Sequence, residues 1–194
     1  MDEATPLVVG ISGSSGAPIA LAALRALKEA RVPVSLVISR AGARVLREEA
    51  AIAPDEVAAL ADTCYDDEDI AAPIASGSRP TRGMAIVPCS SNTLAKVALG
   101  LGDTLLTRAA HVHLKERRRL VLVPRETPLS PIQVEHMARL SRLGVVLLEA
   151  SPPYYLGFRT IDQATDFLAG KLLDQFGVPH RLYRGWRAGE TGRP

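Results

Sequence analysis

LVVGISGSSGAP, residues 7–18, begins as an apolar run, turns through glycines and serines, and continues into an Ala/Leu-rich helical stretch. A strand, a small-residue turn and a helix form the repeating unit of parallel α/β sheets. Pro18 suits the first turn of a helix, where a missing N–H costs little. The turn could offer N–H groups and hydroxyls to an anion. Its glycine spacing is not G-x-G-x-x-G, which favours a mononucleotide phosphate, with an ordinary capped turn as the alternative.

Short apolar runs alternate with helical stretches along the rest of the chain. We expect strands near residues 7–12, 33–39, 84–88, 119–124 and 144–149. We expect helices over residues 17–30, 41–51, 94–99, 105–114, 132–143 and 161–176. This alternation predicts an α/β fold with a doubly wound parallel sheet, in a single three-layer domain over residues 1–194. Residues 62–69 have the composition of an acidic loop, and residues 180–194 that of a C-terminal tail.

The composition favours a protein that acts on small molecules. The 194 residues are 47% hydrophobic, enough for one domain with a substantial core. The 23 basic and 21 acidic residues leave a net charge of +2, too small to predict nucleic acid or a membrane as partner. Cys64 and Cys89 fit neither a disulfide framework nor a zinc signature, and His111 and His113 lack partners at ligand spacing, so no metal is expected. No targeting or membrane-spanning segment is recognisable, which predicts a cytoplasmic protein.

Polar side chains follow the expected strands at their carboxyl ends, where ligands bind in open parallel sheets. Ser39 ends the second strand, and Ser-Ser-Asn-Thr at residues 90–93 follows the third. Arg125 and Glu126 follow the fourth. Arginine binds phosphate well, and a glutamate can transfer a proton. Together with the turn at residues 13–16, these positions predict a site for a phosphorylated ligand.

The chain resembles the UbiX-type flavin prenyltransferases from about Val8 to Trp186. The matching motifs are GSSG at 13–16, VIS at 37–39, Glu49, IASGS at 74–78, GM at 83–84, PCS at 88–90, LLTRAA at 105–110 and LKERRRLVLVPRETPLS at 114–130. The resemblance implies a Rossmann-like, flavodoxin-like fold that binds reduced FMN. It implies transfer of the dimethylallyl group of dimethylallyl phosphate to N5 and C6 of FMN, without a metal, to make prenylated FMN for a recipient decarboxylase. It also implies a homo-oligomer, a dodecamer in many relatives.

The resemblance assigns expected roles to three groups of residues. FMN would contact Gly13, Ser14, Ser15, Ser39, Ser90, Ser91, Asn92, Thr93 and Arg125. The prenyl substrate would contact Tyr155 and Lys171, with Lys115 nearby and Trp186 over the allyl group. Proton transfer would involve Ser15, Glu49 and Glu126. Cations suit the phosphate that leaves, and aromatic faces suit the electron-poor allyl fragment.

Some alternatives remain open from the sequence. A flavin-dependent cysteine decarboxylase would share the broad fold, but those relatives use a histidine early in the chain, and here none precedes His111. An FMN-binding accessory subunit of an aromatic acid decarboxylase, without catalysis of its own, would need no second phosphate site. Glu49 follows Arg47 and Glu48 in an expected helix. Without the resemblance, these charged neighbours would favour a solvated helix face as the interpretation of Glu49. The family's usual Gly-Ala-Ser-Gly turn is Gly-Ser-Ser-Gly here, which adds one hydroxyl.

Overall fold

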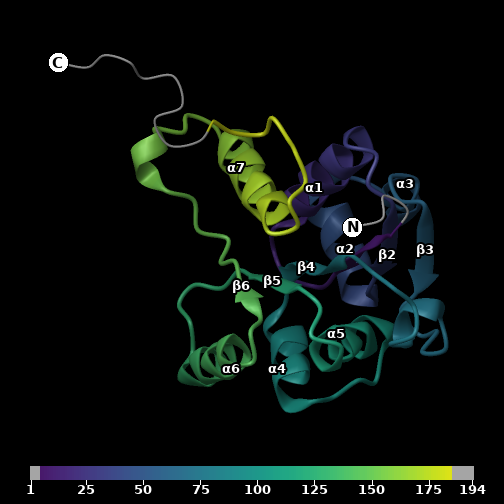
Figure 1. The fold of residues 1–194 in the computed structure, drawn as a ribbon. Helices are drawn as coiled ribbons and strands as arrows, with labels where there is room; N and C mark the ends of the chain where they lie inside the picture. The colour runs from purple at the N-terminus through teal and green to yellow at the C-terminus, as the bar shows by residue number, and fades with distance from the viewer. Residues whose placement is uncertain (1–4, 185–194) are drawn as a thin grey trace.

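The computed structural model describes residues 5–184 and places six parallel strands at the centre of this part of the chain (Figure 1). The strands are β1 (Leu7–Ile11), β2 (Val34–Ile38), β3 (Thr63–Asp66), β4 (Gly83–Cys89), β5 (Leu120–Pro124) and β6 (Val146–Leu147). Their order across the sheet is β3-β2-β1-β4-β5-β6, the order of doubly wound dinucleotide-binding folds. The winding reverses between β1 and β4. In such sheets, ligands bind outside the carboxyl ends of the strands at the reversal.

Helices cover both faces of the sheet, so the predicted three-layer α/β/α arrangement is confirmed (Figure 1). One face carries α1 (Ala17–Glu29), α2 (Arg40–Ala50), α3 (Pro54–Ala58) and α7 (Ile161–Asp174). The other carries α4 (Ser91–Leu99), α5 (Leu105–Lys115) and α6 (Pro131–Arg142). Two short 3-10 helices are η1 (Pro73–Ala75) and η2 (Tyr154–Leu156). Strands β1, β4 and β5 are buried along their whole length, as expected of strands covered on both faces.

Serine side chains begin the helices that follow three of the strands. Ser39 accepts a hydrogen bond from the N–H of Gly42, and Ser90 and Ser130 cap α4 and α6 in the same way. Each cap binds an N–H group that has no acceptor within its own helix. These three serines therefore have a structural role as helix caps. They fix the starts of α2, α4 and α6 at the carboxyl edge of the sheet.

The structure corrects the prediction between β2 and β4. Residues 62–69, expected to form an acidic loop, contain strand β3, and α3 precedes it. β3 pairs with β2 from Thr63 opposite Ser35 to Asp66 opposite Ile38. It lies at the edge of the sheet and is mostly exposed, so its sequence carries no apolar pattern. Pairing with a neighbouring strand, which sequence composition does not reveal, makes it a strand.

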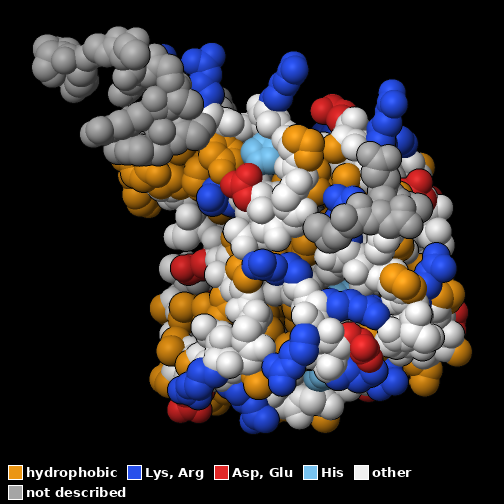
Figure 2. All heavy atoms as spheres, in the orientation of Figure 1, with side chains coloured by type: hydrophobic (Ala, Val, Ile, Leu, Met, Phe, Trp, Pro, Cys, Tyr) orange, Lys and Arg blue, Asp and Glu red, His pale blue; other side chains and the backbone are white. Residues whose placement is uncertain are grey.

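Residues 148–160, between β6 and α7, leave the body of the fold (Figure 1). They carry η2, in which Tyr154 is 99% and Tyr155 66% exposed. Figure 2 shows hydrophobic side chains gathered on this projecting part. The chain then returns in α7, which packs against α1, and Tyr183 stacks edge-on against Phe167 of α7. The beginning of the expected C-terminal tail therefore packs on α7. No helix within residues 5–184 is both long enough and apolar enough to cross a membrane.

Candidate active site

Hydrogen bonds join the carboxyl ends of β1, β4 and β5 into one surface. The buried hydroxyl of Ser12 donates to the carbonyl oxygen of Pro88 at 2.9 Å and accepts from the N–H of Ser90 at 2.7 Å. The hydroxyl of Ser14 donates to the carbonyl oxygen of Arg125 at 3.1 Å. Ser12 was not among the predicted site residues. A polar residue ending a wholly apolar strand was the only signal that could have indicated it.

Gly13 and Gly42 let α2 pack closely against the first turn. A Cβ atom on Gly13 would lie 2.4 Å from the Cβ of Ala41, and one on Gly42 would lie 2.4 Å from the carbonyl oxygen of Ile11. Real Cβ atoms do not approach other atoms so closely, so both positions require glycine while α2 stays in place. This contact brings α2, with Ser39 at its start and Glu49 near its end, against the turn between β1 and α1.

Glu49 binds the N-terminus of α1 through its carboxylate. Its Oε2 atom accepts from the N–H groups of Gly16 at 2.8 Å and Ala17 at 3.1 Å, and Ser15 also hydrogen-bonds to it. Burial acts to raise the pKa of Glu49, but these hydrogen bonds and the charge of Arg125 outweigh it and lower the pKa. Glu49 is exposed, as the solvated-face alternative expected, but its carboxylate also binds another helix. The N–H groups of Gly16 and Ala17, expected to face a ligand anion, bind this carboxylate instead.

A second carboxylate, that of Glu126, lies where β5 ends. Its Oε2 accepts a hydrogen bond from the Ser91 hydroxyl at 3.1 Å and is 3.4 Å from the side-chain nitrogen of Gln133. The hydrogen bonds from Ser91 and Gln133, and more weakly the charge of Arg125, lower the pKa of Glu126. Arg125 thus lowers the pKa of two carboxylates on different elements. At neutral pH both Glu49 and Glu126 are ionised and able to accept protons.

The first turn of α4 is suited to bind a phosphate. The Ser90 hydroxyl accepts from the N–H of Thr93 at 3.2 Å and donates to the Thr93 hydroxyl at 3.0 Å. Ser91 and Asn92 occupy the first two helical positions, whose N–H groups have no acceptor within the helix. Such N–H groups at a helix N-terminus bind phosphate. The residues present therefore fit a phosphate-bearing flavin, held at α4 while the N-terminus of α1 binds Glu49.

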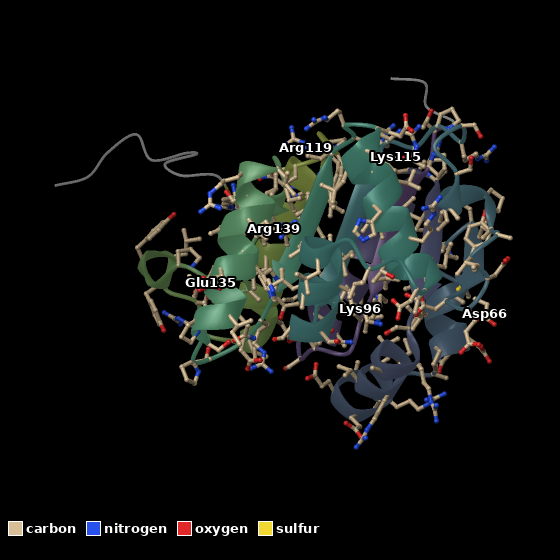
Figure 3. All side chains as sticks on the ribbon, turned by 90° about the horizontal axis from the view of Figure 1, so that it is seen from below. Asp66, Lys96, Lys115, Arg119, Glu135 and Arg139 are labelled. Carbon is tan, nitrogen blue, oxygen red and sulfur yellow. The ribbon has the colours of Figure 1, made fainter. Side chains whose placement is uncertain are left out.

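The cations expected at the prenyl phosphate lie elsewhere in the same chain. Lys115, the last residue of α5, forms an ion pair with Glu116 and lies beside Gly77. Figure 3 shows Lys115 and Arg119 together at one end of the molecule, apart from Glu135 of α6. Since Arg119 immediately precedes β5, Lys115 lies near the amino edge of the sheet, opposite Glu126.

Lys171 and Tyr155 are also separate from the carboxylates. The Lys171 Nζ atom lies 3.4 Å from Oδ2 of Asp174 and 5.8 Å from the centre of the Tyr183 ring. Tyr155 lies in η2, on the projecting segment. Trp186 lies outside the described residues. One chain therefore brings together the turn after β1, Glu49, the start of α4, Arg125 and Glu126, but not Lys115, Tyr155 or Lys171.

Among residues 5–184, no group of three or more histidine, cysteine, aspartate or glutamate side chains could hold a metal ion. The site instead combines phosphate-binding helix geometry with hydroxyls, one arginine and two ionised carboxylates. Such a set can bind a phosphorylated cofactor and move protons beside it. These are properties of a flavin-binding protein.

The comparisons with known proteins agree with that class. Residues 1–172 match the family described as Flavoprotein. A flavin prenyltransferase UbiX from Halalkalibacterium halodurans is 45% identical over 188 residues, covering 92% of this chain and 91% of the relative. The chain therefore belongs to the flavin prenyltransferase family. These close relatives favour a prenyltransferase over the cysteine decarboxylase alternative.

Two solved structures extend the comparison. A dodecameric FMN-dependent UbiX-like decarboxylase from Escherichia coli O157:H7 has a TM-score of 0.92 and 43% identity, covering 95% of this chain and 100% of that one. AnUbiX (PadA1), in complex with FMN and dimethylallyl pyrophosphate, has a TM-score of 0.88 and 40% identity, covering 94% and 99%. The whole described fold thus has its counterpart in proteins of this family.

Proposed function

We propose that the protein transfers the dimethylallyl group of dimethylallyl phosphate to N5 and C6 of reduced FMN, producing prenylated FMN for a recipient decarboxylase. The observation that carries the proposal is the placement of Glu49, Arg125 and Glu126 together at the reversal between β1 and β4. A protein that only carried FMN would have no need for two ionised carboxylates beside it. The relatives named above support the same reaction.

The proposed roles follow from the geometry of each residue. FMN is held by Gly13, Ser14, Ser15, Ser39, Ser90, Ser91, Asn92, Thr93 and Arg125. When bound, reduced FMN supplies the electron-rich ring atoms that take up the allyl group. Arg125 stabilises negative charge as the C–O bond of the substrate breaks. Glu49, hydrogen-bonded to Ser15, accepts the proton that the ring loses, and Glu126 exchanges a proton with the departing phosphate.

Mass spectrometry tests the proposal directly. The purified protein is incubated anaerobically with reduced FMN and dimethylallyl phosphate, and the flavin is then extracted and weighed. We expect a gain of one C5 prenyl unit. If FMN stays tightly bound but emerges unmodified under conditions in which the H. halodurans relative prenylates it, the accessory-subunit alternative replaces the proposal.

We further propose that the protein forms a dodecamer like the E. coli structure, and that a neighbouring subunit completes each site. Lys115 and Lys171 lie away from Glu126 within one chain, although the phosphate needs cations around it. The exposed segment with Tyr155 has the apolar surface that a subunit contact buries (Figure 2). In this arrangement Lys115, Tyr155 and Lys171 reach the phosphate and the allyl group of another copy's site.

Assemblies of mixed subunits test the shared site. Glu126→Gln and Lys171→Ala chains, each inactive alone, are co-expressed with different tags and purified as one particle. If the two residues come from different subunits, random assembly leaves about a quarter of the sites intact, and activity returns in that proportion.

The control pairs Glu126→Gln with Glu49→Gln, because the charge of Arg125 lowers the pKa of both carboxylates within one chain. This mixture is expected to stay inactive, since no site in it has both glutamates. Equal inactivity of the Glu126→Gln and Lys171→Ala mixture would show that one chain supplies the whole site.

A further inference from the structure

Glu126 is held by side chains from two different helices. Ser91 is the first residue of α4, and Gln133 lies in the first turn of α6. The Ser91 hydroxyl donates to Oε2 of Glu126 at 3.1 Å, and the Gln133 side-chain nitrogen donates to the Ser91 oxygen and lies 3.4 Å from the same Oε2. The three side chains therefore form a network that converges on one carboxylate oxygen.

The start of α6 fixes the orientation of the Gln133 amide. The side-chain Oε1 of Gln133 accepts from the backbone N–H of Ser130 at 2.7 Å, and the backbone N–H of Gln133 donates to the Ser130 hydroxyl at 3.2 Å. This is a capping box, in which a glutamine at the third helical position binds back to the cap residue. Because the amide oxygen is bound to Ser130, the amide nitrogen must point toward Ser91 and Glu126. A capping box usually serves only to begin a helix. In this protein it also directs the side-chain nitrogen of Gln133 toward Glu126.

We propose that Ser91 and Gln133 are positioning residues that hold the Glu126 carboxylate through Oε2, in the orientation in which it meets the substrate phosphate. The role given to the phosphate rests on the proposed function. The hydrogen-bond network does not, and it can be tested without substrate.

The charges around Glu126 agree with this assignment. The hydrogen bond from Ser91 is the largest influence that lowers the pKa of Glu126, and that from Gln133 is the next. Arg125, on the same loop, adds a smaller effect in the same direction, and it also acts on Glu49 of α2. The other charged or titratable residues of these two helices are Lys96, Glu135, His136, Arg139 and Arg142, and none of them acts on the pKa of Glu126. Lys96 of α4 is bound to Asp103, and Glu135 of α6 is exposed.

Two substitutions separate the network from the capping of α6. Ser91→Ala removes the hydroxyl that bridges Gln133 and Glu126. Gln133→Glu keeps the capping box, because a glutamate accepts equally well from the N–H of Ser130. It replaces the donor beside Glu126 with a second carboxylate. Each change should raise the pKa of Glu126, and Ser91→Thr, which keeps a hydroxyl, should restore it.

Carboxyl labelling measures this pKa in the full-length protein. A carbodiimide couples glycine ethyl ester to protonated carboxyls, and mass spectrometry follows the tryptic peptide of residues 126–139 over a range of pH. That peptide also contains Glu135, which serves as an internal reference. We expect the labelling midpoint of Glu126 to move to higher pH in Ser91→Ala and in Gln133→Glu. Glu135 should be unchanged in every variant. An unchanged midpoint for Glu126 in both variants would refute the proposal.

The pH dependence of catalysis supplies the second measurement. If catalysis needs an ionised Glu126, kcat/KM falls as the pH drops through the pKa of this residue. A higher pKa therefore moves this acidic limb of the pH profile to higher pH. We expect this shift in Ser91→Ala and Gln133→Glu, with the wild-type limb recovered in Ser91→Thr. The labelling midpoint of Glu126 could shift in the variants while the wild-type protein prenylates no flavin. That result would support the hydrogen-bond network and contradict the proposed function. The new carboxylate in Gln133→Glu also repels Glu126, so Ser91→Ala is the variant that decides. If midpoint and limb both stay in place in Ser91→Ala, the proposal fails.

Discussion

Replacing Glu126 with glutamine is expected to lower the rate of prenyl transfer by at least about 100-fold, the usual contribution of a residue that transfers protons in the rate-limiting region of a reaction. The amide keeps the shape of the side chain and can still accept the hydrogen bond from Ser91. It cannot exchange a proton with the departing phosphate. FMN binding should be preserved, because the start of α4 and the turn after β1 are untouched.

The measurement is single-turnover formation of prenylated FMN, with FMN affinity determined separately. Glu135→Gln is the matched control, because Glu135 is an exposed glutamate of α6 that takes no part in the hydrogen bonds to Glu126. It should transfer the prenyl group at the wild-type rate. A Glu126→Gln protein within threefold of the wild-type rate would remove Glu126 from the proposed chemistry.

Gly42→Ala is expected to destabilise the protein and to release FMN. The new methyl group would lie 2.4 Å from the carbonyl oxygen and 2.9 Å from the carbonyl carbon of Ile11, at the end of β1. A backbone atom of a central strand cannot yield, so α2 must move and carry Ser39 and Glu49 with it. Overpacking of this kind costs about 1–3 kcal/mol of unfolding free energy. For a chain of this length, that corresponds to a Tm lower by roughly 2–12 °C.

Thermal unfolding followed by circular dichroism, together with flavin fluorescence on titration with FMN, checks both effects. Gly102→Ala is the control for the same chemical change. Its Cβ would lie 3.3 Å from a ring carbon of His111, a side chain that can adjust. A Tm for Gly42→Ala equal to that of Gly102→Ala would show that α2 is not seated against β1 as the structure has it.

The sequence was sufficient for most of the fold because the buried strands carry their own signal. β1, β4 and β5 are wholly buried, so their apolar runs could be recognised without any partner. The edge strand β3 could not be recognised, because its residues are mostly exposed and its strand character depends on pairing with β2. β6 was expected over residues 144–149 but extends only over Val146–Leu147.

For the candidate site too, local features could be predicted from the sequence and contacts between distant elements could not. Arg125 and Glu126 could be located because a charged pair at the end of an apolar strand falls at the ligand-binding edge of a parallel sheet. The capping box of Ser130 and Gln133 was not among the predictions, although S-x-x-Q is a local pattern. That Gln133 directs its amide at Glu126 was not visible, because this depends on how α6 packs beside α4.

Taken by itself, the sequence determined what depends on near neighbours: the apolar strands, the glycine and serine turns, the helix caps and the residue types at the strand ends. The family resemblance added expected roles for Glu49, Lys115, Tyr155 and Lys171. The tertiary structure decided which of these side chains meet. It bound Glu49 to the N-terminus of α1, 32 and 33 residues away in the chain, and it set Lys115 beyond the opposite edge of the sheet from Glu126. Local patterns cannot encode such distances, because the packing of α2 and α5 on the sheet fixes where their ends lie.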